Sequence, residues 1–438
     1  MSEAWQPRTV GESVRITKGV TYASSDYASE DDGHVFLTIK CFAKGGGFNT
    51  EGVKYFRGVY LPEQEIAPGE LLIAKTDLTR DGDIIGSPMI APDFGEGKKA
   101  LPSMDLSVLR TMDGNTDLRF LFYRLMLGDA RRFMWAHSAG STVLHLESKA
   151  FPKFTFSAPK RVEQRRIATI LSTLDEAIEQ TEALIAKHQQ IKAGLMHDLF
   201  TRGVTPDGRV RPTREQAPDL YKESPLGCIP KEWTVGRLSQ YLDPLAGIKP
   251  GPFGSSLTKD NYVSTGFRIY GQEQVIAGNL EIGDYYITEA KFLEMAAFEV
   301  LADDVLISLV GTVGCVLVVK PPFERGIINP RLMRLRPARG IVLSGFLKHL
   351  LLSANVRRQL EILAGGGTMP VINGKIIRRL VIPLLSLYGQ ARMVERIDAL
   401  DGTLASSAEA LAKLRQQKHG LMHDLLTGRV RVNFLVKE

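Results

Sequence analysis

Two His-Asp pairs are the residues of this 438-residue chain that most suggest chemistry, His197–Asp198 and His423–Asp424. Imidazole and carboxylate groups are the ligands of many catalytic metal ions, so the pairs raise the question of a metal-dependent phosphohydrolase. Such a centre needs further His and Asp ligands that converge in space, and the end of a helix does not supply them. We therefore interpret both histidines as packing or interface residues and predict no catalytic residue and no metal site.

Cofactor and nucleotide motifs point the same way. The glycine runs Gly45–Gly47 and Gly365–Gly367 lack the G-x-G-x-x-G context, and no G-x-x-x-x-G-K-[ST] motif is present. The phrase NPRL at Asn329–Leu332 lacks the second proline and the aromatic residue of an adenine methyltransferase loop, so a turn is the better interpretation. We expect this chain to bind no cofactor.

The His-Asp pairs belong to a longer repeat. The phrase GLMHDL stands at Gly194–Leu199 and again at Gly420–Leu425, 226 residues later. The same offset relates many other identical residues, which indicates a duplicated unit rather than a chance match. These pairs are Lys192 and Lys418, Gln190 and Gln416, Thr201 and Thr427, Val204 and Val430, Asp175 and Asp401, Gln164 and Gln390, Gly140 and Gly366, and Thr142 and Thr368.

Composition restricts the class of protein. A chain of this length exceeds one ordinary core, so two or more domains are expected. A charged content of 24% and the lack of a long apolar run favour a soluble protein, and the first residues do not resemble a signal peptide. Three separated cysteines fit a reducing cytoplasm. A net charge of +6 permits nucleic-acid binding without requiring it.

Each half begins with a mixed segment. From Trp5 to Pro159, short apolar stretches are broken by Gly and Pro, and a helical stretch at Leu118–Phe133 lies among them. The second half opens at Trp233 after a polar linker, Arg209–Glu232, that could be disordered. These patterns predict two mixed α/β domains. The strands expected in the first are Val35–Lys40, Glu70–Ala74, Ile84–Ile85, Met89–Ile90 and Phe154–Phe156.

Each half ends in a long helix. Val162–Phe200 contains no proline, and its apolar residues follow the 3-4 spacing of a coiled-coil seam; Gly203 and the TPDG at Thr205–Gly208 end it. Gln390–Leu426 has the same pattern. One possibility is that each helix packs only on its own domain. We favour the alternative that the narrow seams pair with each other as an antiparallel coiled coil, which places two similar domains at opposite ends of a rod with pseudo-twofold symmetry.

Two domains at a fixed spacing suit duplex DNA, because its groove returns to the same face every ~34–36 Å. The helices repeat closely, whereas the domains are dissimilar outside a few anchor points. A constant scaffold with two unlike domains is suited to a bipartite, asymmetric DNA site.

In this order of segments the chain resembles the specificity (S) subunits of type I restriction–modification systems, over nearly its whole length. The resemblance rests on several motifs, weak singly and strong together. They are PKEWTVGRL at Pro230–Leu238, PGELLIAK at Pro68–Lys75 with its counterpart Asp304–Leu309 and the GTVG at Gly311–Gly314, GST at Gly140–Thr142 with GGT at Gly366–Thr368, PKRVEQRRIATILSTLDEAI at Pro159–Ile178, and the tails GLMHDLFTRGV and GLMHDLLTGRV. The second helix departs at Gly389, where the first copy has Glu163.

The resemblance implies two target recognition domains, 1–160 and 233–385, each followed by a conserved long helix, 161–204 and 386–430, with a linker at 205–232 and a tail at 431–438. It implies a non-catalytic subunit that reads double-stranded DNA and holds two modification (methyltransferase) subunits. S-adenosylmethionine is then expected in those partners, which methylate adenine, and two endonuclease/translocase subunits can join them.

DNA-contact candidates are polar and basic loop residues, since phosphates are bound by Lys, Arg, Ser and Thr, and bases are read by a few Arg, Lys, Asn and Gln. For each one, a solvated loop residue is an equally good interpretation. The candidates are Lys18, Thr21, Tyr22, Lys75, Thr76, Thr79, Arg80, Ser138, Ser141 and Thr142 in the first domain, and Lys249, Ser255, Ser256, Lys259, Gln272, Gln274, Ser308, Thr312, Asn329, Arg331 and Thr368 in the second.

Two other classes of function stay open at this stage. A self-contained restriction and modification enzyme would need the cofactor and nuclease motifs that the sequence lacks. A structural coiled-coil adaptor would account for the helices but not for two dissimilar domains.

Overall fold

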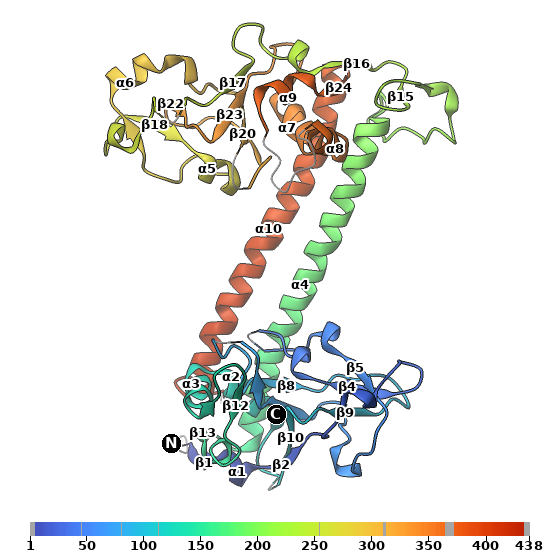
Figure 1. The fold of residues 1–438 in the computed structure, drawn as a ribbon, viewed down its shortest axis with the longest axis vertical. Helices are drawn as coiled ribbons and strands as arrows, with labels where there is room; N and C mark the ends of the chain where they lie inside the picture. Colours follow the sequence, from blue (N-terminus) through green and yellow to red (C-terminus); the bar gives the residue numbers. More distant parts are fainter. Residues whose placement is uncertain are drawn as a thin grey trace. The chain divides into compact units, whose positions relative to one another are not determined.

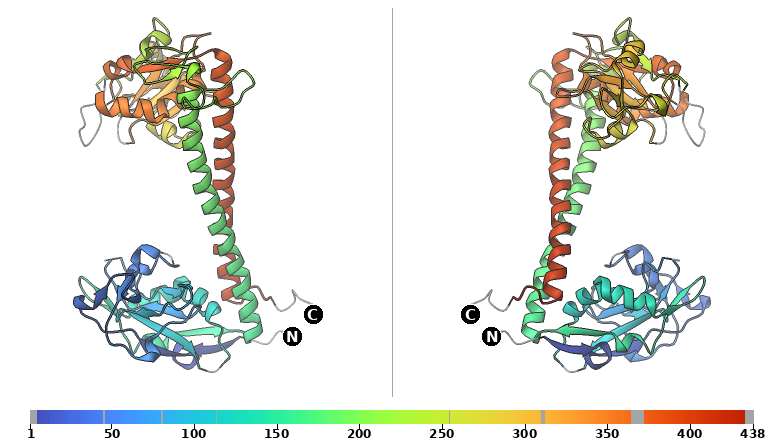
Figure 2. Two further views of the ribbon diagram at one scale, coloured as in Figure 1. Left: turned by 90° about the vertical axis from the view of Figure 1, so that its right-hand side faces the viewer. Right: turned by 90° about the vertical axis from the view of Figure 1, so that its left-hand side faces the viewer.

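The computed structural model describes residues 5–44, 46–79, 81–112, 114–253, 255–309, 312–363 and 372–432. The chain forms two compact units. The first unit is Met1–Ala183 with Glu409–Glu438, and the second is Leu184–Ala408. The two longest helices, α4 (Arg161–Arg202) and α10 (Leu387–Leu426), each begin in one unit and end in the other. Within each unit they lie side by side (Figures 1 and 2).

The first unit contains two four-stranded sheets. One is antiparallel, with the order β2 (Val14–Lys18), β10 (Leu106–Thr111), β6 (Leu71–Ala74) and β8 (Pro88–Ile90). The other has the order β3 (Tyr27–Ala28), β5 (Lys54–Phe56), β4 (His34–Leu37) and β9 (Ala100–Pro102). The smaller pairings are β11 (Ser138–Ala139) with β12 (Leu144–Leu146) and β7 (Thr76–Asp77), and β1 (Gln6–Thr9) with β13 (Thr155–Ala158).

The second unit repeats the first sheet. Its order is β17 (Ile248–Pro250), β23 (Leu332–Leu335), β20 (Val305–Ser308) and β21 (Val316–Val318). A three-stranded sheet has the order β19 (Tyr286–Ile287), β18 (Phe267–Tyr270) and β22 (Gly326–Ile328). Two further pairs are β16 (Thr234–Arg237) with β24 (Val381–Leu384), and β14 (Tyr221–Lys222) with β15 (Ile229–Pro230).

Short helices pack on these sheets. The first unit has α1 (Val10–Ser13), α2 (Leu118–Met126) and α3 (Gly128–Ala136), and the second has α5 (Gln272–Ala277), α6 (Glu289–Glu294), α7 (Ser344–Leu352), α8 (Ala354–Leu363) and α9 (Gly374–Arg379). α2 contacts β6 and β8, and α7 contacts the corresponding strands β20 and β21. The mixed α/β class predicted for both domains is therefore confirmed.

The predicted antiparallel pairing of the long helices is also confirmed within the units. In the first unit, Asp175 of α4 pairs with Lys418 of α10 (Oδ1–Nζ, 2.5 Å), and Glu182 pairs with Arg415 (Oε1–Nη2, 2.6 Å). The numbers rise along α4 as they fall along α10, so the helices run in opposite directions. In the second unit, Lys192 of α4 forms an ion pair with Asp401 of α10.

The repeated phrase has a packing role in both units. Leu199 and Phe200, at the end of α4, are buried in the core of the second unit with Met393 and Ile397 of α10. The same arrangement recurs in the first unit with the two helices exchanged, where the end of α10 joins the start of α4 in the core; the residues are Leu425, Leu426, Ile167 and Leu171. Each long helix therefore begins on the domain that precedes it and ends in the core of the other.

A glycine ends α4 as predicted. Gly203 has a φ of +67°, the left-handed conformation that glycine adopts at helix ends without steric cost. A Cβ atom there would lie 2.5 Å from Cζ2 of Trp233, which packs directly on the helix end. Gly428, with a φ of +75°, has the same relation to the ring of Trp5 after α10.

Two local expectations for the first unit are wrong. The stretch Leu118–Phe133 is two helices, because Leu127 has an extended ψ of 150° between α2 and α3. Ile84–Ile85 is not a strand, since the N–H groups of both residues donate to the carboxylate of Asp77 (2.5 and 2.8 Å) and hold the segment in a turn.

The linker is folded rather than disordered. Its strands β14 and β15 pair with each other, and Ile229 is buried in the core of the second unit. Arg211 donates from Nε to the carbonyl oxygen of Arg202 (3.0 Å) and from Nη2 to that of Val204 (2.9 Å). A guanidinium group thus satisfies carbonyl groups at and just beyond the end of α4, where a helix leaves acceptors without partners.

Candidate nucleic-acid interface

Two predicted lysines of the first unit share one cavity. Lys18 ends β2, and Lys75 follows β6. Ser107 of the intervening strand β10 pairs with Lys18 on one side and Ile73 on the other, so alternate residues place all of these side chains on one sheet face. The cavity measures about 170 Å³, and its walls include Leu146, Ser148, Phe151 and Pro152.

This cavity is suited to an anion. Burial lowers the pKa of Lys75 below its ordinary value; the positive charge of Lys18 lowers it further, and Asp105 acts in the opposite direction. Among the described residues, neither ammonium group has a hydrogen-bond or ion-pair partner. Two unpaired cations that repel each other in a partly desolvated site would both be stabilised by a bound anion such as a phosphate.

Backbone packing fixes the end of β2. A Cβ atom at Gly19 would lie 1.9 Å from the carbonyl oxygen of Ser103, so no other residue fits there without a shift. Of the candidates that follow, Thr21 is exposed, whereas the Tyr22 ring packs on Tyr27 and Phe36. A hydrogen bond with Tyr27, together with burial, raises the pKa of Tyr22.

The loop after β7 is organised by a buried carboxylate. Asp77 accepts from the backbone N–H and the hydroxyl of Thr79 (2.7 and 2.8 Å) as well as from Ile84 and Ile85. Burial alone would raise the pKa of Asp77, but these hydrogen bonds outweigh it and hold the pKa below its usual range. Thr79 is therefore rigidly placed and Thr76 is buried in β7, while Arg80 lies outside the described residues.

The first of the two GST/GGT positions is a tight hairpin between β11 and β12. Gly140 has a φ of +138°, and a Cβ atom there would lie 1.9 Å from the carbonyl oxygen of Val143. Ser138 donates to the carbonyl oxygen of Trp135 (2.7 Å), and Ser141 and Thr142 are exposed at the turn. The second position, with Thr368, lies outside the described residues.

Three predicted residues of the second unit, Lys259, Asn329 and Arg331, come together around a cavity of about 680 Å³. The cavity is also lined by Tyr262, Tyr285 and Glu273, which are not among the residues predicted from the sequence. The spacing of Lys259 and Tyr262, a basic residue followed by an aromatic one in a polar loop, was the available signal.

Other predicted residues of the second unit are occupied by contacts within the fold. Gln274 is buried; its Oε1 accepts from the N–H of Gly271 (2.8 Å) and its Nε2 donates to Ile282 (2.7 Å). Ser308 is buried and donates to the carbonyl oxygen of Thr312 (2.5 Å). The ammonium of Lys249 lies 4.5 Å from the ring centroid of Phe298. Gln272 is half-buried at the start of α5, and Ser255, Ser256 and Thr312 are exposed.

Corresponding positions of the two units carry different chemistry. Strand register aligns Ser107 with Met333, and Lys18, the partner of Ser107, with Pro250. Lys75 follows β6 as Leu309 follows β20. Among its described residues, the second unit therefore has no counterpart of the two-lysine cavity. The backbone approach is nevertheless the same, because a Cβ atom at Gly251 would lie 1.9 Å from the carbonyl oxygen of Asn329, as one at Gly19 would from that of Ser103.

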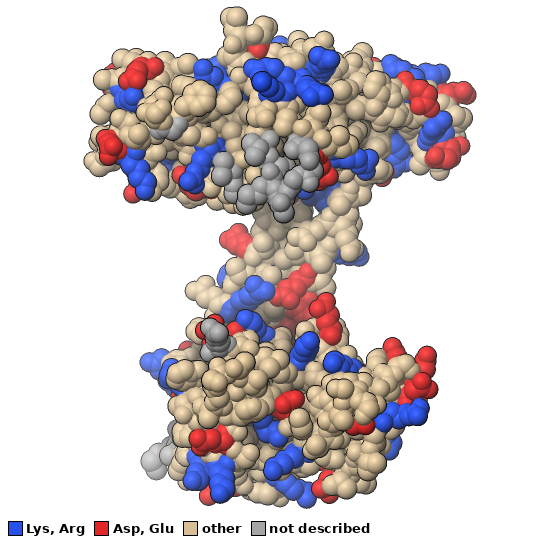
Figure 3. All heavy atoms as spheres, in the orientation of Figure 1, with Lys and Arg blue, Asp and Glu red and all other residues tan. Residues whose placement is uncertain are grey.

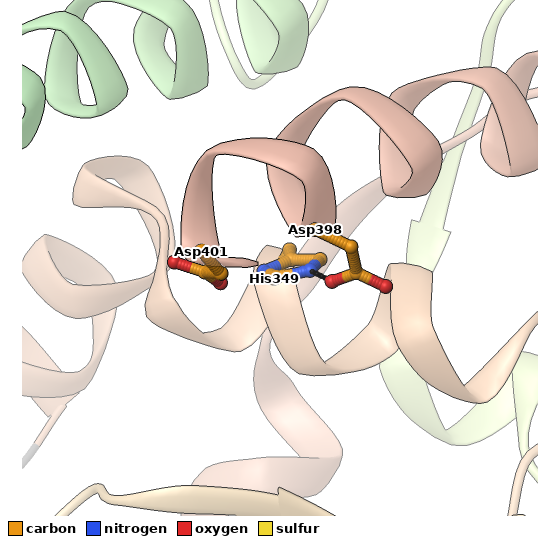
Figure 4. A group of neighbouring side chains, drawn as sticks. All are labelled: His349, Asp398 and Asp401. Atoms are coloured by element: carbon orange, nitrogen blue, oxygen red, sulfur yellow. Dashed lines mark hydrogen bonds and ion pairs between the residues drawn. The ribbon is translucent and has the colours of Figure 1, made fainter. Parts of the chain in front are cut away.

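One His-Asp cluster has the donor set of a metal site. Figure 4 shows His349 of α7 with Asp398 and Asp401 of α10 pointing toward one another, and their ligand atoms lie within 4.8 Å. His349 Nε2 and Asp398 Oδ1 are 2.8 Å apart. The ammonium of Lys192 already neutralises Asp401, so we interpret the group as a contact between helices rather than a metal site.

Surface charge is mixed rather than concentrated. On the visible face of each unit, Lys and Arg are interspersed with Asp and Glu (Figure 3). This distribution points to local contacts instead of one continuous basic surface. Within the described part of the chain, no helix has the length and apolar character needed to cross a membrane.

Comparison with known proteins agrees with this geometry. Residues 2–189 match the family model of the type I restriction modification DNA specificity domain. The specificity subunit of the type I restriction enzyme MjaVIII from Methanocaldococcus jannaschii is 25% identical over 378 residues, which are 85% of this chain and 83% of that protein. The EcoBI specificity subunit of Escherichia coli is 22% identical over 404 residues, 91% of this chain and 79% of that protein.

The fold is that of solved specificity subunits. The S subunit of a type I restriction–modification system from M. genitalium superimposes with a TM-score of 0.59 at 17% identity, covering 96% of both chains. Two unlike domains on a repeated helical frame are the architecture that this chain shares with that subunit. The first domain matches the type I restriction modification DNA specificity domain, and the chain as a whole is similar to specificity subunits of such systems.

Proposed function

We propose that this chain reads a bipartite, asymmetric DNA site, with one part contacted by each unit. The observation that carries the proposal is the contrast between the repeated helix-end packing and the unlike cavities of the two units. A shared frame supports two readers of the same architecture, and unlike cavities give them unlike preferences. Two half-sites of different sequence are the simplest target for such a protein.

In the first unit, Lys18 and Lys75 bind one phosphate of the DNA backbone. The support is their convergence on a cavity with serines at its wall and without a counter-ion among the described residues. In the second unit, Lys259, Asn329 and Arg331 contact the other half-site. The exposed candidates Thr21, Ser141 and Thr142 lie on loops that are open to solvent and are proposed to make further contacts.

The partners follow from the duplicated frame. In each unit, the contact between α4 and α10 is formed by equivalent residues of the repeat, with the roles of the two helices exchanged. The chain therefore offers two similar surfaces, which suits two copies of a modification subunit. S-adenosylmethionine is bound by those copies and not by this chain. In a system that also cleaves DNA, two endonuclease/translocase subunits complete the assembly.

The decisive test is the pattern of DNA methylation in a host with and without this chain, both expressing the modification subunits. We expect one two-part adenine-methylation motif to disappear when the chain is absent. An unchanged methylome, or methyl transfer by the purified chain alone, would contradict the proposal.

Single lysine substitutions test the phosphate contact. Lys75→Met in the complex with the modification subunits is expected to weaken binding to all sequences alike and to reduce the salt slope of log K by about one. Lys222→Met, at an exposed lysine of the linker, is the control and should leave the slope unchanged. A change in sequence preference would instead make Lys75 a base reader.

A further inference from the structure

The second unit contains a cavity that its DNA-contact candidates do not fully explain. Tyr262 and Tyr285 form part of its wall, with ring centroids 5.3 Å apart and an interplanar angle of 49°. Tyr285 is 50% exposed, so part of its side chain is open to solvent. Leu257, Ile269 and Pro330 add apolar surface. At about 680 Å³ the cavity is larger than a phosphate requires.

Charged and polar groups surround these rings. Burial raises the pKa of Tyr262, Glu273 raises it further, and Arg331 acts in the opposite direction, so an anion and a cation both lie close to this ring. Lys259 and Arg331 have no side-chain partner among the described residues. Asn329 Oδ1 accepts from the N–H of Arg331 (2.9 Å), which leaves its amide nitrogen as a free donor.

The shape of the site restricts what can enter it. Base edges of an intact duplex lie inside grooves and are read by side chains that protrude, whereas a cavity accepts a group that protrudes from the DNA. A phosphate and an unstacked nucleotide both protrude. The aromatic and apolar walls favour the nucleotide, because bases stack on tyrosine rings while a phosphate gains nothing from them.

We propose that this cavity receives one unstacked base of the bound DNA, with the base against Tyr285 and its phosphate near Lys259 and Arg331. The inference rests on the proposed function and specifies how the second unit reads its half-site. The carboxylate of Glu273 and the amide nitrogen of Asn329 line the same cavity, and together they match a Watson–Crick edge that offers an exocyclic amino donor and a ring nitrogen acceptor. The base is therefore adenine or cytosine.

In the part of the first unit that the structure describes, the corresponding residues do not form this site. Strands β10 and β23 correspond to each other. Just before these strands, the first unit has Ser103 where the second has Asn329, and Asp105 where the second has Arg331. A carboxylate in place of the guanidinium group would repel a nucleotide phosphate. Base extrusion is thus expected in one half-site only.

The test uses the full chain in complex with its modification subunits and duplexes that carry the methylated motif. A mismatch is placed in turn opposite each base of the second half-site except the adenine that the modification subunits methylate, because those subunits must extrude that adenine themselves. At one adenine or cytosine we expect about tenfold or greater tightening, because the mismatch removes the cost of unpairing an extruded base. Every other mismatch should weaken binding or leave it unchanged.

Variants of the tyrosine separate stacking from other roles. Tyr285→Ala should abolish the gain at that position, and Tyr285→Phe should retain it because stacking needs the ring and not the hydroxyl. Tyr388→Ala, at a comparably exposed tyrosine on α10, is the control and should keep the gain.

Two outcomes have different meanings. Sequence-specific binding without tightening at any mismatch would overturn the inference alone and place base reading inside the duplex. Absence of sequence-specific binding by the complex would overturn the proposed function and the inference with it.

Discussion

The two units of this protein share their frame to the level of single hydrogen bonds. A buried glutamine near the start of each long helix, Gln164 or Gln390, accepts one backbone N–H and donates to two carbonyl groups. Its partners are Asp117, Asn115 and Pro159 in the first unit and Leu343, Ile341 and Leu385 in the second, at distances of 2.8 to 3.0 Å. The offset between corresponding partners is the 226 residues of the repeat.

The cavities show the opposite behaviour. Lysine, lysine and serine in the first unit correspond to proline, leucine and methionine in the second, whereas the tyrosine-lined cavity is built around Asn329 and Arg331 where the first unit has Ser103 and Asp105. Side chains that hold the domain to the helices are therefore repeated, whereas side chains that line the cavities vary. The following predictions test that division.

The largest effect is expected from the helix ends. Leu199→Ala and Leu425→Ala each remove a leucine that is at most 2% exposed, which costs about 2–5 kcal/mol. Leu199→Ala should destabilise the second unit and Leu425→Ala should destabilise the first. Hydrogen exchange of peptides from each unit measures both effects. Leu184→Ala, at a 45% exposed leucine of α4, should change stability by less than about 0.5 kcal/mol. Faster hydrogen exchange in the first unit for Leu199→Ala, or in the second unit for Leu425→Ala, would contradict the packing of the helix ends described above.

The buried glutamines come next. Gln164→Ala and Gln390→Ala each leave backbone groups without partners in a buried position, a loss of about 1–3 kcal/mol. Because the hydrogen bonds are equivalent, the two losses should agree within about 0.5 kcal/mol in denaturant titrations. Gln190→Ala on the exposed side of α4 is the control. A large difference between the two variants would show that the units are supported differently.

The frame was predictable from sequence because it is repeated. The 226-residue offset, the 3-4 spacing and the absence of proline predicted both long helices and their antiparallel pairing. The position of Glu163 is not repeated, since the second copy has Gly389 there, and this difference indicates that Glu163 has no role in the second unit. It forms a two-point ion pair with Arg431 (2.8 Å to each carboxylate oxygen), a contact that the first unit alone requires.

The cavities were only partly predictable. Residue type alone makes Lys18 and Lys75 candidates for DNA contacts. Their neighbouring sequence does not reveal that they come together, because this depends on the pairing of β2 and β6 on either side of β10. Gln274 and Ser308 have the same polar types and are buried, since their hydrogen bonds close a turn rather than face solvent. Tyr262 and Tyr285, 23 residues apart, meet only in the folded domain.

A smaller effect is expected from pH. Tyr123 and His349 are corresponding residues of the repeat. Tyr123 contacts Asp175 in the first unit, whereas His349 contacts Asp398, three residues before the counterpart of Asp175, in the second. Burial lowers the pKa of His349; Asp398 and Asp401 oppose this and Lys348 adds to it. A folded pKa below the unfolded value of ~6.5 means that the unfolded state binds the proton more tightly, so this contribution is present above pH ~6.5 and is lost as the pH falls.

The second unit should therefore lose stability between pH 7.5 and 5.5 through this group, and His349→Gln should reduce that loss. Thermal unfolding of the wild type and the variant at both pH values measures the difference. Tyr123 does not titrate in this window, because burial and Asp175 raise its pKa. Tyr123→Phe is thus the matched control, and equal pH dependence of wild type and His349→Gln would contradict the prediction.

The smallest effect is expected from the ion pairs between the long helices, Lys192 with Asp401 and Lys418 with Asp175. Their side chains are 20–36% exposed, so solvent screens them and a coupling energy of only about 0.2–1 kcal/mol is expected from each double-mutant cycle. As parts of the repeated frame, the two couplings should be equal and should fall together at 1 M salt. Asp175 also accepts from Tyr123 (2.6 Å), so its cycle is best measured in the Tyr123→Phe background. Unequal couplings in that background would mean that the seam has diverged along with the domains, and the division between repeated support and variable readers would fail at its centre.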